Sequence, residues 1–398
     1  MTASRLDALE VASGLVLGTH GAPPTARVET APPEALEAAI RPALARPPCL
    51  VSFSGGRDSS AILAAAAALA RREGLPLPIP ATNRFPAVAE AGESDWQDRV
   101  VRWVGVDDWL RLDFADELDC VGPVAAGALR RHGLLYPCNA HFHLPLLAAA
   151  AGGSLLTGIG GDEMFGTRGR AALVASGAAR PVPRDILRLG LALSPRPVRR
   201  NVLRRRSTPL PWLRREAERE VARRWADFAA GEPLRWSAHV RWCSRSRSLR
   251  LGLESLDLLA ADERVHLVHP FADPTFLAAL ASWPSVPADR TAATKALFGA
   301  LLPTPVAQRA TKASFDGAFL STYSREFAEG WNGGGADAGL VDVDWLRENW
   351  RSEAPVAQTF LQLQAAWLAE SGGEAREQRL DAALEPVPAG GTPELERR

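Results

Sequence analysis

The segment at residues 52–60 reads SFSGGRDSS and places glycines, hydroxyls and a carboxylate between an apolar run and an alanine-rich stretch. Adjacent glycines let the backbone turn sharply, so that its N–H groups can approach an anion. A helix that begins at about Ser59 adds unpaired N–H groups and the positive end of its dipole. The hydroxyls of Ser54 and Ser59 can donate hydrogen bonds to phosphate oxygens, and Asp58 can bind an accompanying magnesium ion. This set predicts a polyphosphate site, because a plain strand-to-helix turn needs only one glycine.

A second segment, LLTGIGGDEMFG at residues 155–166, again joins glycines to an acidic pair at the end of a predicted strand. Ligands of open parallel sheets bind at the carboxyl ends of the strands. The two loops can therefore face one nucleotide, with Asp58 and Asp162 as oxygen ligands of the same magnesium ion. Magnesium prefers this combination of a few carboxylates with phosphates. The Walker pattern is absent, so the first loop is not an ordinary P-loop.

Hydrophobic patterning predicts the elements that must position these loops. The first half of the chain alternates between expected strands at residues 49–53, 77–82, 109–112 and 154–157 and expected helices at residues 59–72, 94–104 and 142–151. This alternation predicts an α/β fold in which helices cover both faces of a parallel sheet. Pro76, Pro78 and Pro80 predict an irregular start to the second strand. Beyond about residue 170 the pattern becomes helical, so a mainly helical part is expected to follow.

Composition limits the class of protein. The chain has 398 residues and a formal net charge of zero, so its global charge predicts neither a nucleic-acid nor a membrane partner. It contains no apolar stretch of about 18 residues, and its start, MTASRLDALE, has acids where a signal peptide needs apolar residues. We therefore expect a cytoplasmic protein. The four cysteines form no C-x-x-C pair and are expected to be buried thiols.

Arginines are dense between Arg196 and Arg224, where acids are few. We interpret this segment either as the polar face of helices or as a docking surface for an acidic protein or peptide. Binding to such a surface would weaken steeply with added salt.

The S-G-G-x-D-S order of residues 54–59 resembles the pyrophosphate loop of the ATP pyrophosphatase superfamily. Together with the acidic loop it resembles the synthetase domain of asparagine synthetases, and a third region supports this. PFAD at residues 270–273 is followed by ATKAL at residues 293–297 and by RATKASF at residues 309–315. The resemblance extends from residue 49 to about residue 319 in the order of the family. It implies an adenine nucleotide α-hydrolase-like fold.

The resemblance also implies ATP and Mg²⁺ as cofactors and assigns roles by position. The residues that would bind pyrophosphate and magnesium are Ser54, Gly55, Gly56, Asp58 and Ser59. Those that would contact the adenosine, mainly through backbone atoms, are Phe53, Thr82 and Gly158. Asp162 would be the second magnesium ligand. Lys312 would contact the α-phosphate and the departing pyrophosphate, where a cation stabilises developing charge, and Lys295 is a second candidate.

These observations divide the chain into four expected regions. They are an N-terminal appendage over residues 1–48, an α/β ATP-binding core over residues 49–170, a mainly helical synthetase portion over residues 171–370 and a disordered tail over residues 371–398.

Two departures from the family pattern concern the amine. Family members that use glutamine begin with a nucleophilic cysteine, whereas the first cysteine here is Cys49, so no glutaminase activity is expected. Three residues before the second aspartate, asparagine synthetases have a glutamate and β-lactam synthetases a tyrosine, but this chain has Ile159, which cannot move a proton. His266 and His269 precede the PFAD motif, and we interpret each either as a base or as a structural side chain.

The resemblance implies an ATP-dependent carboxylate–amine ligase. It would form an acyl-adenylate with release of pyrophosphate and then an amide with release of AMP. The parent activity is asparagine synthesis, and the alternative is ring closure on a specialised metabolite or peptide, as in β-lactam synthetases and lasso-peptide cyclases. Ile159 favours a substrate other than free ammonia. An alternative of another class is a regulatory protein that binds ATP without turnover.

Overall fold

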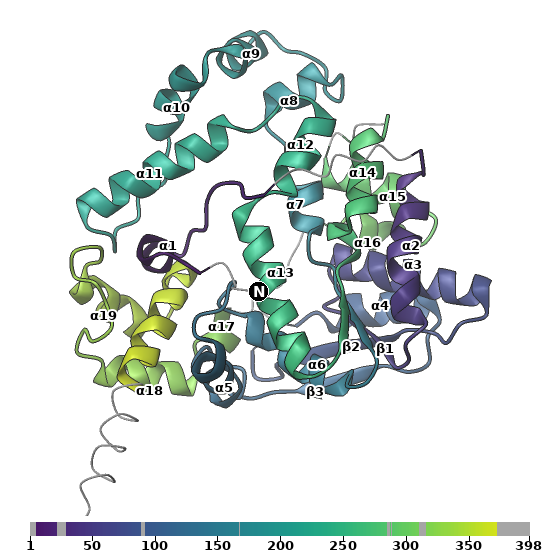
Figure 1. The fold of residues 1–398 in the computed structure, drawn as a ribbon, viewed down its shortest axis with the longest axis horizontal. Helices are drawn as coiled ribbons and strands as arrows, with labels where there is room; N and C mark the ends of the chain where they lie inside the picture. Colours follow the sequence, from purple (N-terminus) through teal and green to yellow (C-terminus); the bar gives the residue numbers. More distant parts are fainter. Residues whose placement is uncertain are drawn as a thin grey trace, which may run out of the picture.

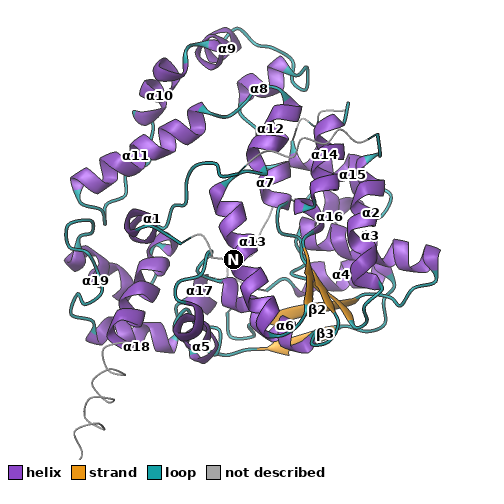
Figure 2. Ribbon diagram, viewed as in Figure 1, coloured by secondary structure: helices purple, strands orange, loops and turns teal. Residues whose placement is uncertain are grey.

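The computed structural model of the chain describes residues 5–21, 29–88, 92–166, 168–284, 287, 289–309 and 316–371. Within them, five parallel strands form one sheet in the order β3-β2-β1-β4-β5 (Figure 1; Figure 2). The strands are β1 (Cys49–Ser52), β2 (Ile79–Arg84), β3 (Leu110–Asp113), β4 (Ser154–Leu156) and β5 (His266–Val268). The parallel sheet and its helices confirm the predicted α/β class.

Helices cover both faces of the sheet. One face packs against α2 (Pro32–Leu44), α3 (Arg57–Glu73), α4 (Ser94–Val104), α12 (Trp236–Cys243), α14 (Pro274–Ser282), α15 (Arg290–Phe298) and α16 (Thr304–Ala307). The other packs against α5 (Pro123–His132), the 3₁₀ turn η2 (Ala140–His143), α6 (Leu144–Ala149) and α13 (Arg247–Asp262). Successive side chains of a strand point to opposite faces, and β1 follows this rule. Cys49 and Val51 belong to the first core and Leu50 to the second.

Helix α3, which follows β1, forms for local reasons. Its centre is rich in alanine, the residue with the highest helix propensity. It ends at Gly74, which has a left-handed φ of 66° and whose N–H donates to the carbonyl of Ala70. It begins at Arg57, two residues before the predicted start. The first turn of α3 therefore includes Asp58 and Ser59.

Two features differ from the predicted division of the chain. Helix α2 lies in the expected N-terminal appendage, yet Leu36, Ile40 and Leu44 are fully buried in the first core. Strand β5 lies in the expected helical portion, yet it pairs with β4 and completes the sheet. The α/β core therefore draws on residues on both sides of the range 49–170.

A second body of helices is formed around its own core. Its elements are α1 (Ala8–Ser13), α11 (Arg215–Ala230), α17 (Asp316–Phe319), α18 (Thr322–Gly330), α19 (Val343–Arg351), the 3₁₀ turn η4 (Ala357–Thr359) and a last helical segment at residues 360–371. The core contains the fully buried side chains of Trp331, Trp350 and Phe360. The tail predicted from residue 371 lies outside the described residues, apart from residue 371 itself.

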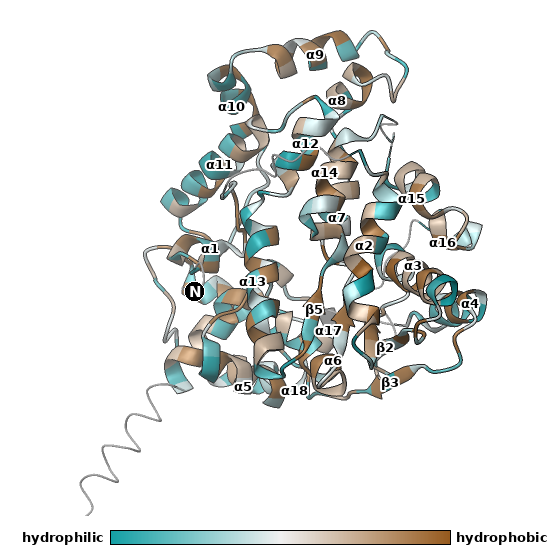
Figure 3. Cartoon of the chain, turned by 45° about the vertical axis from the view of Figure 1, so that its right-hand side comes forward, coloured by the Kyte–Doolittle hydropathy of each residue, from teal (hydrophilic) through white to brown (hydrophobic). Residues whose placement is uncertain are grey.

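Between β4 and β5 the chain makes a long helical excursion. It runs through α7 (Gly161–Phe165), α8 (Arg170–Ala175), α9 (Asp185–Leu193), α10 (Arg196–Arg204), α11, α12 and α13 before reaching β5, which the 3₁₀ turn η3 (Pro270–Ala272) follows. Helices α9 and α10 lie at the end of the molecule remote from the sheet (Figure 1; Figure 3).

The cysteines are free thiols. Cys49, Cys120 and Cys243 are buried and Cys138 is half-buried, which agrees with the expectation from their spacing. Across the described residues, no helix combines the length and the apolar character needed to cross a bilayer.

Candidate active site

The two predicted loops meet at the centre of the sheet. The chain moves outward from β1 through β2 to β3 on one side, and from β4 to β5 on the other, so the strand order reverses between β1 and β4. Ligands of open α/β sheets bind at this switch point, beyond the carboxyl ends of the strands. A cavity of about 700 Å³ lies there. The predicted site residues that line it are Phe53, Ser54, Gly56, Asp58, Ser59, Gly158 and Asp162.

The loop after β1 has the geometry that an anion site requires. Gly55 has a left-handed φ of 82°, and a Cβ at this position would lie 2.8 Å from Cγ of Gln97. The N–H of Gly56 donates to the Ser54 hydroxyl, and the hydroxyls of Ser54 and Ser59 lie 3.2 Å apart. The first N–H groups of a helix have no partner within the helix. The start of α3 therefore offers donors beside two hydroxyls.

Three charged side chains form a bridge between the two loops. Arg290, the first residue of α15, makes an ion pair with Asp58 and a second ion pair with Asp162. The side chain of Asp58 is 18% exposed and that of Asp162 is 57% exposed. Burial raises the pKa of Asp58, and the charge of Arg290 opposes this shift. The two carboxylates lie close enough to contact one cation.

This donor set fits magnesium. Mg²⁺ is usually held by one or two carboxylates together with the phosphates of its nucleotide. Asp58 and Asp162 supply the carboxylates, and their shared contact with Arg290 shows that they can face the same cation. Among the described residues there is no cluster of three or more His, Cys, Asp or Glu side chains, so phosphates would have to complete the coordination.

A buried ion pair holds the loop after β1 in place. Arg309 and Glu93 pair with each other, and each side chain is only 5% exposed. Nη1 of Arg309 also donates to the carbonyl of Gly55 at 3.2 Å, and its guanidinium lies over the Trp96 ring. Nε2 of Gln97 donates to the carbonyl of Ser54 at 3.1 Å. The residues around α4 and the segment that ends at Arg309 thus position the loop.

Apart from these charged residues, much of the lining of the cavity is apolar. Its lining includes Tyr136, Pro137, Phe142, Leu146, Ile159 and Leu249, with Asn83, Asn139 and His143 as polar members. Burial raises the pKa of Tyr136 to about 12 and lowers that of His143 to about 4, so both are neutral at pH 7. Ile159 packs against both cores of the sheet while lining the cavity.

Two side chains singled out in the sequence, those of Thr82 and His269, make contacts within the fold. The hydroxyl of Thr82 is buried and donates to the carbonyl of Phe53 at 2.7 Å, while Nε1 of Trp109 donates to Thr82. Thr82 thus joins the ends of β1 and β2, and its neighbours Ala81 and Asn83 line the cavity instead. Nδ1 of His269 lies 2.6 Å from the Thr157 hydroxyl, and burial lowers the pKa of His269 to about 3. This environment favours the structural interpretation of His269.

The structure treats the two candidate lysines differently. Lys295 is exposed in α15 and is not among the residues that line the cavity, so the geometry gives it no contact there. Lys312 lies outside the described residues, and its role stays a prediction. Arg290 is the cation that sequence reasoning missed. The sequence did contain a signal for Arg290, because Arg290 begins the helix that contains Lys295. The start of a helix that follows the PFAD motif can face the end of the sheet at which the two loops lie.

The fold and the site together define an α/β protein with a parallel sheet and a large cavity at the switch point of that sheet. Residues 33–371 match the family model described as asparagine synthase, and the chain therefore belongs to the asparagine synthase family. No glutaminase-type domain is matched. No curated protein matches the chain significantly. At the level of the family, the chain is an ATP-dependent ligase that acts in amidation. The match includes α2, in agreement with its place in the core.

Proposed function

We propose that this protein is a carboxylate–amine ligase that forms AMP. A carboxylate oxygen attacks the α-phosphorus of ATP, the bond to the β-phosphate breaks, and pyrophosphate leaves. The amine nitrogen then attacks the acyl carbon, the bond to AMP breaks, and the amine loses a proton. The observation that carries the proposal is one cavity with two kinds of lining: charged residues at the switch point, here called the phosphate end, and mainly apolar side chains, here called the apolar end.

The residues of the phosphate end have separate tasks in this proposal. Ser54, Ser59 and the first N–H groups of α3 bind the pyrophosphate portion of ATP, because they present donors together. Asp58 and Asp162 would hold Mg²⁺, which neutralises charge on the phosphates when bound. Lys312 would stabilise the charge that develops on the leaving pyrophosphate. Holding both substrates in one cavity supplies the advantage of orientation.

The apolar end supports a particular class of acyl substrate. Among the described residues, the cations that line the cavity are Arg57, Arg290 and Arg309, and all three contact residues of the phosphate end or of α15. A second carboxylate, such as that of aspartate, would therefore meet no cation of the described residues at the apolar end. An acyl group with a large apolar part fits better. This observation favours ring closure on a metabolite or peptide over asparagine synthesis.

The residues that line the cavity also bear on the nitrogen source. Ile159 gives ammonium no local base, whereas an amine tethered within the acyl substrate has a high effective concentration and depends less on such a base. The purified chain is not expected to use glutamine, since the match covers the synthase family model and includes no glutaminase-type domain. A cytoplasmic location is part of the proposal, because ATP and reduced thiols are found there.

The test combines two assays. ATP–pyrophosphate exchange with a panel of carboxylates should respond to apolar acids and not to aspartate. Product formation is then measured with glutamine, ammonium and candidate amines, each alongside ATP and magnesium. Efficient use of aspartate with ammonium would restore asparagine synthesis, and efficient use of glutamine would overturn the assignment of the amine. Exchange with no carboxylate at all, despite measurable ATP binding, would favour the regulatory protein.

A further inference from the structure

Helix α9 is rich in apolar residues, but most of its side chains are not buried. Six of its nine residues are Ile, Leu or Ala, yet Asp185 is its only buried residue. The side chains of Ile186, Leu187 and Leu193 are 73%, 79% and 74% exposed. Figure 3 shows the brown, apolar colour of α9 at the end of the molecule. An exposed apolar patch of this kind marks a surface that binds a protein, a membrane or a ligand.

Neighbouring residues extend the patch. Val182, before α9, and Val198, in α10, are also exposed, so five of the eight large apolar side chains exposed in the described residues lie within residues 182–198. Helix α10 has no buried residue. We call residues 182–206 the α9–α10 surface.

The α9–α10 surface is strongly basic. Residues 186–215 contain nine arginines and no Asp or Glu. The exposed side chains of Arg196, Arg204, Arg205 and Arg206 form no ion pair with another described residue. Arg196 donates to the carbonyl of Asp227 and Arg204 to the amide oxygen of Asn201, but no described carboxylate neutralises the charge of these four arginines, so the charge is available to a partner.

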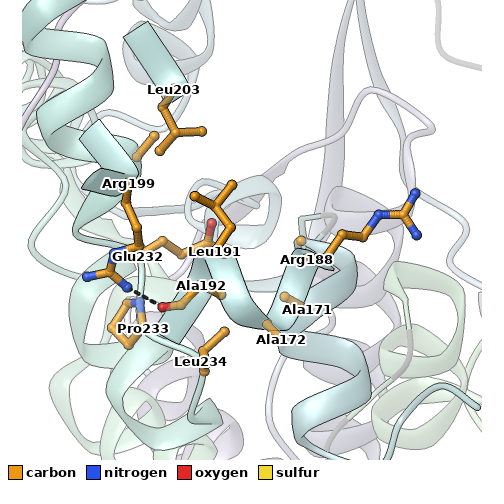
Figure 4. Close-up of a pocket in the computed structure, with 12 residues that line it drawn as sticks. Ala171, Ala172, Arg188, Leu191, Ala192, Arg199, Leu203, Glu232, Pro233 and Leu234 are labelled. Carbon is orange, nitrogen blue, oxygen red and sulfur yellow. Dashed lines mark hydrogen bonds between the residues drawn. The ribbon is translucent and has the colours of Figure 1, made fainter. Parts of the chain in front are cut away.

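A small pocket lies at the inner side of this surface. It has a volume of about 140 Å³ and lies between α8, α9, α10 and the end of α11 (Figure 4). Leu191 and Leu203 contribute to its apolar wall, and its charged members are Arg188, Arg199 and Glu232. Nη1 of Arg199 donates to the carbonyl of Ala192 at 2.7 Å, while its buried Nε has no partner. An apolar cavity of about 150 Å³ is large enough for a benzene ring, so one apolar side chain fits here.

We propose that the α9–α10 surface is the docking site for an acidic, amphipathic segment of a partner protein. Apolar side chains of the segment cover Ile186, Leu187 and Leu193, and one of them enters the pocket. Its carboxylates pair with the arginines of the surface that form no ion pair within the described residues. The planar guanidinium group of arginine binds a carboxylate in a bidentate way.

Three observations favour such a partner over a lipid bilayer or a second copy. The exposed apolar residues of the α9–α10 surface include no Trp, Tyr or Phe, the residues that anchor proteins at membrane interfaces. The pocket fits an inserted side chain rather than a flat surface. Two copies of the same basic surface repel each other, which opposes symmetrical pairing. The proposal does not depend on the reaction, because the surface lies remote from the sheet and its cavity (Figure 1).

Binding of a synthetic peptide to the full chain tests the proposal. The probe is a fluorescent helical peptide with leucines on one face and glutamates on the other. Its controls are a scrambled isomer, an analogue with glutamine for glutamate, and vesicles of phosphatidylcholine with phosphatidylglycerol. We expect the acidic amphipathic peptide to bind in about the micromolar range, with steep weakening as salt is added. Both control peptides should bind at least tenfold more weakly.

Two variants and two matched controls locate the binding. The triple variant Arg204→Glu, Arg205→Glu and Arg206→Glu and the double variant Leu187→Ser and Leu193→Ser should each weaken peptide binding at least tenfold. Arg102→Glu and Leu77→Ser, exposed residues of α4 and of the loop before β2, should leave it unchanged. All four should keep wild-type ATP–pyrophosphate exchange and circular dichroism. Equal binding by all variants, absence of peptide binding, or binding to vesicles instead of peptide overturns the proposal.

Discussion

At the residue scale, two carboxylates share one guanidinium, and this arrangement decides what substitutions in the site should do. Asp58→Asn and Asp162→Asn should each reduce pyrophosphate release to near the background, because each removes a carboxylate that faces the cavity and is proposed to bind magnesium. The fold should survive, since burial already disfavours the charged form of Asp58. ATP–pyrophosphate exchange measures the loss, with circular dichroism as the control. Turnover retained in either variant would exclude that residue from the metal site.

Arg290 pairs with the two carboxylates that are proposed to bind magnesium, so it would compete with the ion for them. In Arg290→Ala the carboxylates of Asp58 and Asp162 lose their shared cation, so Mg²⁺ without nucleotide should raise the Tm of this variant more than that of the wild type. Thermal unfolding at several magnesium concentrations measures the difference, with sodium chloride of equal ionic strength as the control. An equal response of both proteins would contradict competition at this position.

Lys312 is predicted to act on the transition state rather than on ATP binding. Lys312→Ala should slow adenylation more than it weakens affinity for ATP, since charge builds up on the phosphate oxygens as the bond breaks. Single-turnover adenylation and equilibrium nucleotide binding separate the two effects. Lys295→Ala is the matched control and should change neither, because Lys295 is exposed on α15. An equal loss of rate and affinity in Lys312→Ala would indicate simple binding.

At the scale of elements, the loop after β1 depends on the buried pair of Arg309 and Glu93. Glu93→Gln removes the carboxylate that faces a buried guanidinium and should lower the free energy of unfolding by about 3–5 kcal/mol. It should also weaken ATP binding, because Arg309 contacts the carbonyl of Gly55. Urea unfolding measures the first effect. Glu93→Gln combined with Arg309→Met should recover part of the stability, and a double variant less stable than the single one would contradict this account.

At the scale of the whole molecule, buried histidines make stability depend on pH. Burial and the neighbouring His143 lower the pKa of His269 from 6.5 to about 3. As the pH falls from about 6.5, the unfolded chain takes up a proton at this position while the folded chain does not. The contribution of neutral His269 to the free energy of unfolding is complete well above pH 6.5 and is lost as the pH falls towards 3.

His269→Gln should therefore flatten the dependence of the free energy of unfolding on pH below 6.5. Urea unfolding at pH 7, 6 and 5 measures the slope, and comparison at pH 7 and 8 serves as the control, because His269 does not titrate there. A slope that is unchanged in the variant below pH 6.5 would show that His269 does not contribute.

Local patterns in the sequence predicted most of the fold and the chemistry of the site. The alternation of apolar runs and helices predicted the parallel sheet, and α4 has the predicted bounds. The glycines and carboxylates of the two loops predicted that Asp58 and Asp162 lie near each other, as the structure shows. These features are determined by the sequence because turn geometry, helix propensity and hydrophobic period depend on residues close together in the chain.

Only the tertiary structure decided which distant groups complete the site and which surfaces stay open. Arg290 reaches Asp58 across 232 positions, and Arg309 reaches Glu93 across 216. The pattern of α9 predicts an apolar helix, but its exposure depends on the packing of α8 and α10 around it. Burial and ion pairing are decided when segments far apart in the chain pack together. No local pattern contains that information, because the free energy of each contact depends on the neighbours that the complete fold brings to it.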